Sequence, residues 1–147
     1  MYSLFKINNM AGTIDMQHLM YLNLFEKVTR VSTRFCFKYN ETIFFCVPRS
    51  FMSRAIGEGG KNVRRLSEIL SKKIKIISAP DGISDARRFV ESIVNPVRFK
   101  GLEVRNDDMI VTGNTQSKAA MIGRNKRRLF EMQKVIKDFF NKDFKVM

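Results

Sequence analysis

The residues best suited to chemistry lie in one short stretch, Ile56–Leu66, which has the sequence IGEGGKNVRRL. Three glycines within four residues, followed by Lys61, suit a turn whose backbone approaches a phosphate closely, because glycine has no Cβ and adopts positive φ without strain. Two very different proteins build such a turn: nucleotide-binding P-loops and RNA-binding loops between two helices. The surrounding sequence has to distinguish them.

The P-loop interpretation fails at two of the four fixed positions of its motif. Aligned on Gly60 and Lys61, the motif G-x-x-x-x-G-K-[ST] places Ala55 at its first glycine and Asn62 at its hydroxyl position. The apolar residues before the loop have a helical spacing, whereas a P-loop follows a buried strand. Neither paired carboxylates nor a Ser/His/Asp set accompanies the loop. We therefore expect that the protein is not an enzyme and that it uses no cofactor.

The charge balance predicts a polyanionic partner. The chain has 147 residues, and its 27 Lys and Arg exceed its 14 Asp and Glu, which gives a net charge of +13 and a pI of about 10.1. Nucleic acid and acidic membrane surfaces both fit such a charge, and so does a soluble protein that is merely basic. With 44% hydrophobic residues the chain can bury one ordinary core or two small ones.

Other features narrow the setting. We find no signal peptide and no run of ~20 apolar residues that could span a membrane, so we expect a cytoplasmic protein with no membrane partner. Two apolar runs that contain Cys36 and Cys46 read as the arms of a hairpin about Asn40-Glu41. The cysteines oppose each other only if opposed residue numbers sum to 82, so a disulfide stays open, although two buried thiols are favoured. Two cysteines and the one histidine, His18, are too few for a metal site.

The chain repeats itself at an offset of 66 residues, because Ile56-Gly57 recurs as Ile122-Gly123. Apolar positions of the following helix recur at the same offset; the pairs are Leu66 with Met132, Ile69 with Val135, and Leu70 with Ile136. The turn at Asn40-Glu41 falls on Asn106-Asp107. The repeat predicts two units of one fold. Leu102 and Val104 lie one step out of phase with Phe35 and Phe37, which predicts a register difference or a bulge in the second unit.

Each unit is expected to follow the order helix, strand, strand, helix, helix, strand. The first unit is predicted to contain 14–29, 32–39, 42–48, 50–56, 61–71 and 73–78. The second is predicted to contain 83–95, 97–105, 108–113, 115–122, 126–139 and 143–146. Pro80, Asp81 and Gly82 interrupt both periods and place a boundary in 78–84.

The predicted organisation is therefore a lead-in at 1–13, a first domain at 14–79 and a second at 83–147. The short linker predicts that the two domains pack against each other. Met1, Met10 and Met16 are alternative starts of the chain.

In an RNA-binding loop, each residue near the glycines has a role. Gly57 and Gly60 let the backbone turn between two helices, and the start of the next helix presents free N–H groups to an anion. Lys61, Arg64 and Arg65 add positive charge, although a solvated helix face would also carry such residues. The predicted RNA-binding residues are Ile56, Gly57, Glu58, Gly59, Gly60, Lys61, Asn62, Arg64 and Arg65.

The second loop has the sequence GRNK, with Lys126 where a second glycine is expected. A residue with a Cβ holds positive φ at a cost of ~1 kcal/mol or more, so the sequence predicts a reshaped turn. The second set of predicted RNA-binding residues is Gly123, Arg124, Asn125, Lys126, Arg127 and Arg128. Two interpretations stay open: these cations bind phosphates through their side chains, or the second unit has lost its RNA site and serves as a packing partner.

The stretch AIGEGGKNVRRLSEILSKKIKII, followed by AAMIGRNKRRLF, resembles the archaeal NusA-like family of tandem KH-domain transcription factors. The resemblance extends over roughly residues 14–146. It implies an α+β fold of two tandem type II KH domains that bind single-stranded RNA, a nascent transcript or rRNA, in transcription elongation or termination.

We expect a monomer. Bacterial relatives carry further polymerase-binding and S1 domains for which these residues leave no room, so contact with RNA polymerase is left open. A two-KH factor of ribosome assembly or rRNA processing is the alternative.

Overall fold

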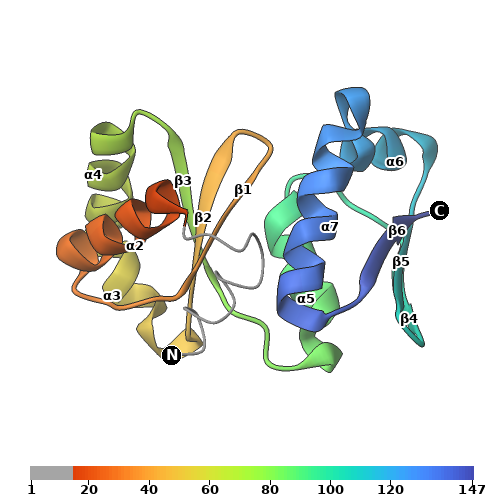
Figure 1. Ribbon diagram of the computed structural model, residues 1–147, viewed down its shortest axis with the longest axis horizontal. Helices are drawn as coiled ribbons and strands as arrows, with labels where there is room; N and C mark the ends of the chain where they lie inside the picture. The colour runs from red at the N-terminus through yellow and green to blue at the C-terminus, as the bar shows by residue number, and fades with distance from the viewer. Residues whose placement is uncertain (1–14) are drawn as a thin grey trace. The chain divides into compact units, whose positions relative to one another are not determined.

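The computed structural model describes residues 15–147, which form two compact units with the break between Ala79 and Pro80. Each unit combines α-helices with one three-stranded sheet, so the fold class is α+β (Figure 1). The α-helices and strands of each unit follow the order α-β-β-α-α-β, as the repeat predicts. The predicted lead-in, 1–13, and Ile14 lie outside the described residues.

The elements of both units lie close to their predicted positions. Unit 1 contains α2 (Met16–Thr29), β1 (Phe35–Tyr39), β2 (Thr42–Val47), the 3-10 turn η1 (Arg49–Phe51), α3 (Met52–Ile56), η2 (Glu58–Gly60), α4 (Lys61–Leu70) and β3 (Lys73–Ser78). Unit 2 contains η3 (Ile83–Asp85), α5 (Ala86–Val94), β4 (Gly101–Arg105), β5 (Asp108–Thr112), α6 (Thr115–Ile122), η4 (Arg124–Lys126), α7 (Arg127–Phe140) and β6 (Asp143–Val146).

The first strand of each unit begins later than predicted. In unit 1 the Thr33 hydroxyl donates to the Cys46 carbonyl and accepts from the Phe35 amide, so a side chain replaces the ladder before β1. In unit 2 the amide of Val97 donates to the carbonyl of Val94 and turns the chain back toward the end of α5. The preceding proline has no amide to donate to a ladder, which favours a loop there. The predicted starts at 32 and 97 are therefore wrong by three and four residues.

The two sheets have the same topology and register. The first two strands of each are antiparallel, and the third runs parallel to the second. Phe35 pairs with Cys46, and 66 residues later Gly101 pairs with Thr112. The predicted register difference or bulge is therefore wrong. Leu102 occupies the position of Cys36, so the same face of both hairpins is turned toward the helices.

The hairpin turn also settles the relation of the two cysteines. Asn40 and Glu41 form a two-residue turn with φ of 51° and 61°, the backbone that tight hairpins favour. Cys36 consequently opposes Phe45, and Cys46 lies on the other face of the sheet. Both thiols are free and buried, as favoured from the sequence. Burial, with a smaller contribution from the Asp15 carboxylate, raises the pKa of Cys36 to about 12.

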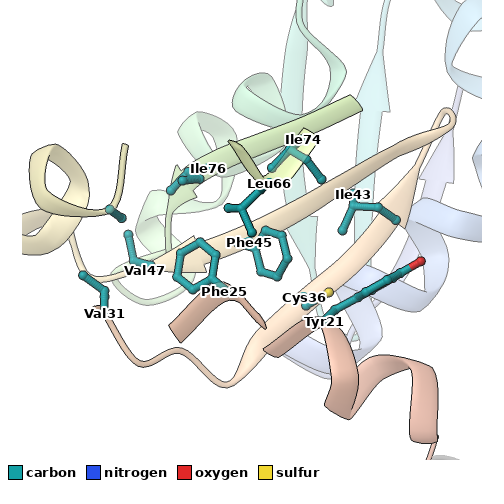
Figure 2. Close-up of a cluster of buried hydrophobic side chains, with 11 residues drawn as sticks. Tyr21, Phe25, Val31, Cys36, Ile43, Phe45, Val47, Leu66, Ile74 and Ile76 are labelled. Atoms are coloured by element: carbon teal, nitrogen blue, oxygen red, sulfur yellow. The ribbon is translucent and has the colours of Figure 1, made fainter. Parts of the chain in front are cut away.

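The helices of unit 1 cover one face of its sheet (Figure 1). Figure 2 shows the ring of Phe25 on α2 beside that of Phe45 on β2; the ring centroids are 4.4 Å apart and the planes differ by 20°. Leu66 of α4 joins the same cluster and is fully buried. Stacked rings of this kind contribute about 0.5–1.5 kcal/mol beyond their buried area. This packing fixes α4, and with it the position of the glycine loop that precedes it.

Unit 2 has its own core between its helices and sheet. Phe89 of α5 contacts the rings of Phe139 and Phe140 at the end of α7, with centroid distances of 4.8 and 5.9 Å. Of the predicted apolar helix pairs, Leu66 and Met132 are both buried. The pair of Ile69 with Val135 is wrong as a common buried face, because Val135 is buried whereas half of the Ile69 surface is exposed (51%).

Candidate nucleic-acid interface

The first glycine of the loop is the most demanding position in unit 1. Gly57 ends α3 with φ 81° and ψ 162°, a region that is essentially restricted to glycine. A Cβ there would lie 2.9 Å from the side-chain nitrogen of Asn62. Gly57 is therefore required both for its conformation and for the space that it leaves.

The next two glycines have a milder requirement. Gly59 and Gly60 have φ of 63° and 76° with ψ near 20°, which is the left-handed region that asparagine and a few other residues also reach. A Cβ on Gly59 would meet nothing within 4 Å, and one on Gly60 would lie at an ordinary 3.6 Å from Arg64. Side chains therefore fit at these two positions, and the one on Gly59 would lie in open space.

Asn62 holds the two helices of the first loop together. Its Nδ2 donates to the carbonyls of Ala55, at 3.1 Å, and Arg54, at 3.3 Å, which belong to the end of α3. The amide of Gly60 closes the turn by donating to the carbonyl of Gly57 at 3.0 Å. Ile56 pins the loop to the apolar core from the α3 side, as predicted. The loop is thus anchored by polar and apolar contacts.

The second loop keeps the backbone of the first. Gly123 has φ 75° and ψ 174°, Asn125 has φ 56° and ψ 27°, and Lys126 has φ 61° and ψ 22°. The prediction of a reshaped turn is therefore wrong. The physical reason is that the position restricted to glycine is the first, which is retained, whereas the fourth needs only the left-handed region, at a cost of about 1–2 kcal/mol for a residue with a Cβ.

Arg128 takes the role of Asn62 in the second loop. It stands 66 residues after Asn62, and its Nη1 donates to the carbonyl of Ala120 at 2.9 Å. A Cβ on Gly123 would lie 2.9 Å from Cγ of Arg128, so the two are packed closely. The sequence predicted Arg128 as an RNA contact, but its guanidinium also supports the loop. The offset of 66 contains the signal, because it aligns the two helix-linking residues.

The predicted cations divide into two groups. Arg64 donates to the carbonyl of Gly59, Arg128 donates to Ala120, and Arg127 lies 3.9 Å from the carboxylate of Glu131. The second group is exposed and has no hydrogen-bond or ion-pair partner among residues 15–147; its members are Lys61, Arg65, Arg124 and Lys126. Each loop therefore presents two cations that are available to an anion.

The helices that follow the loops begin without a side-chain cap. No side chain accepts from the first amides of α4 or α7, whereas Asp15 caps α2 and Asn114 caps α6. Amides of a first helical turn have no partner within the helix, and the helix dipole places a partial positive charge beside them. Both loops thus lead into helix starts that favour anions.

Neither a metal site nor a membrane span is found in the described part of the chain. Within residues 15–147 no three His, Cys, Asp or Glu side chains are grouped so that they could hold a metal ion. Over the same residues, every helix is too short or too polar to cross a bilayer.

Comparison with known proteins supports the resemblance seen in the motifs. The chain is 28% identical over 125 residues to "Probable transcription termination protein NusA" of Methanocaldococcus jannaschii, which covers 82% of this chain and 67% of the relative. It is also 28% identical over 100 residues to a protein of the same name from Methanococcus vannielii, covering 67% of this chain and 56% of the relative. The chain resembles the archaeal NusA-like family. That prediction is confirmed.

The NusA-like relatives are longer than the matched part, since the chain spans between about half and two thirds of their length. No family model matches the chain. Among solved structures, the crystal structure of APE1850 superposes with a TM-score of 0.62 at 24% identity, over 90% of this chain and 99% of that one. The APE1850 match shows a shared fold.

Proposed function

We propose that this protein is a single-stranded RNA-binding factor of the NusA type, which acts in transcription termination or elongation without catalysing a reaction. Its binding modules would be two type II KH domains, at 14–79 and 83–147. The order α-β-β-α-α-β in each unit, with a third strand parallel to the second, supports this assignment. The names of the relatives support the process and a non-enzymatic role.

The observation that carries the proposal is the pair of matching loops. Each turns on a glycine with φ near 80° and ψ beyond 160°, leads into an uncapped helix and exposes cations. In unit 1 the carrying residues are Gly57, Lys61 and Arg65. Phosphates would lie along the loop, close to the first amides of α4, while bases remain accessible to the rest of the module.

Two modules on one chain would bind longer RNA more tightly than either alone. Once one module holds the strand, the other binds at a high effective concentration set by the linker. Each phosphate contact to a cation should make the logarithm of the affinity fall with the logarithm of salt concentration by about 0.7. Binding should therefore be strongly salt dependent.

The test is an anisotropy titration of labelled single-stranded and duplex RNA at two salt concentrations. The variant is Gly59→Asp, and the matched control is Gly59→Asn. A Cβ at Gly59 meets nothing within 4 Å, and both residues tolerate the left-handed backbone, so the pair differs mainly by one negative charge. Asn125 already stands at the corresponding position of the second loop.

We expect wild type and Gly59→Asn to bind single strands with similar affinity and Gly59→Asp to bind them at least tenfold more weakly. Equal binding by all three would remove the first loop from the interface. Tight binding of duplex RNA alone would contradict the single-strand assignment.

The same titration with Lys126→Ala plus Arg127→Ala separates the two interpretations of the second unit. A loss of affinity supports phosphate binding by the second loop. Unchanged affinity would show that those cations are not needed. Co-purification with nascent transcripts, in preference to pre-ribosomal RNA, would support the transcription assignment.

A further inference from the structure

An exposed aromatic ring lies beside the second loop. Phe130 is in the first turn of α7, and 58% of its surface is exposed, more than that of either Phe51 or Val104, which are also exposed. In the described residues it makes no ring contact and packs in no core cluster. A large apolar side chain that is left in water near a cationic loop calls for a partner that is both flat and negatively charged.

The ring shares a helix face with the loop cations. Phe130 follows Lys126 by four residues and Arg127 by three, and side chains at these spacings are neighbours on a helix, with about 5–6 Å between Cβ atoms. Arg124 stands in the turn just before. Arg127 lies near Glu131, which leaves Arg124 and Lys126 as the exposed cations nearest to the ring in sequence.

Comparison of the two units shows what is different about this position. At the offset of 66, Phe130 corresponds to Arg64, whose guanidinium donates to the carbonyl of Gly59 and so stabilises the first loop. A phenylalanine cannot make that bond. The second loop is instead held by Arg128 through Ala120, so Phe130 is not needed for the turn.

We propose that Phe130 is a stacking platform for one unpaired base of single-stranded RNA, whose flanking phosphates bind Arg124 and Lys126. The proposal rests on the function proposed above and gives the second loop a mode of binding that the first lacks. Bases stack on aromatic side chains whatever their identity, so the contact would select for unpaired bases without selecting a sequence. A base within a duplex has no free face to offer, so duplex RNA would contact the cations only.

The chain itself offers a clean probe, because it contains no tryptophan. In Phe130→Trp the new indole is the only one, and its fluorescence reports directly on stacking. The matched control is Val104→Trp, at another exposed apolar residue of unit 2. The hairpin that contains Val104 lies at the C-terminal end of α7, since the amide of Asp143 donates to the carbonyl of Asp107 at 2.7 Å. The 14 residues of α7 place that end about 20 Å from the loop.

Titration with unlabelled single-stranded RNA should quench the fluorescence of Phe130→Trp and leave that of Val104→Trp unchanged, and duplex RNA should quench neither. In anisotropy, Phe130→Leu should bind single strands roughly 5- to 150-fold more weakly, whereas Phe130→Trp should keep the wild-type affinity. Circular dichroism of each variant checks that the fold is retained.

The outcomes separate the two proposals. If wild type binds single strands and Gly59→Asp does not, but Phe130→Trp is not quenched and Phe130→Leu binds normally, the RNA function stands and the stacking role is refuted. If Phe130→Trp is quenched equally by duplex RNA, the ring senses a charge-driven encounter and the stacking role is again refuted. If wild type binds no RNA, both proposals fail.

Discussion

Replacing Gly57 by alanine should destabilise unit 1 far more than the same change at Gly60, although both glycines belong to one loop. At Gly57 the added methyl group must occupy a backbone region that costs about 1–3 kcal/mol for a residue with a Cβ. It must also displace Asn62, whose two hydrogen bonds contribute about 0.5–1.5 kcal/mol each. We expect a loss of about 3 kcal/mol in the free energy of unfolding.

At Gly60 the backbone is left-handed and the new Cβ would have an ordinary contact at 3.6 Å. The conformational cost is about 1–2 kcal/mol, and alanine recovers about 0.4–1 kcal/mol by restricting the unfolded chain. The net effect should be about 1 kcal/mol or less. The two variants therefore differ by about 2 kcal/mol, or some thirtyfold in the population of unfolded unit 1.

Thiol labelling measures that population in unit 1 alone, because both cysteines of the chain lie there and are buried. Under conditions in which refolding is faster than labelling, the rate follows the equilibrium population of the open form. Gly57→Ala should be labelled roughly 100-fold faster than wild type and Gly60→Ala less than tenfold faster. Equal rates for the two variants would refute the assignment of the strict glycine requirement to the first position.

Three further predictions follow from the loops and the core. Lys126→Gly should raise the stability of unit 2 by up to about 1 kcal/mol in urea unfolding, because it relieves a left-handed backbone, while lowering RNA affinity and the salt slope; a loss of stability would contradict this. Asn62→Ala should destabilise unit 1 by about 1–3 kcal/mol in the labelling assay, since it leaves the carbonyls of the α3 end without a donor, whereas unchanged labelling would show that Asn62 does not link the helices. Burial raises the pKa of Cys36 from its ordinary value of 9.0 to about 12, so the unfolded thiol ionises first and stability falls as pH rises from 9 toward 12; between pH 7 and 10 wild type should lose about 1 kcal/mol more than Cys36→Ala, and equal losses would refute that.

Much of the fold follows from local sequence signals. Periods of 3.6 and 2 residues, with turn residues between them, locate the helices and strands, and the offset of 66 implies that whatever one unit forms the other forms too. Boundaries fail where a side chain or a missing donor competes with the ladder, as at Thr33 and Pro96. These competitions depend on which atoms meet in space, and a linear pattern does not contain that.

The sequence by itself determined where the two loops are, because a glycine and a following basic helix are local features of the chain. Only the tertiary structure decided how strict each loop position is, since φ and ψ distinguish Gly57 from Gly60 and show that Lys126 fits the same turn. It also decided which cations are available: Arg128 is tied to a carbonyl eight residues away, whereas Arg124 is exposed. Charge is a property of the residue, but availability is a property of its neighbours, and those are set only when the helices pack.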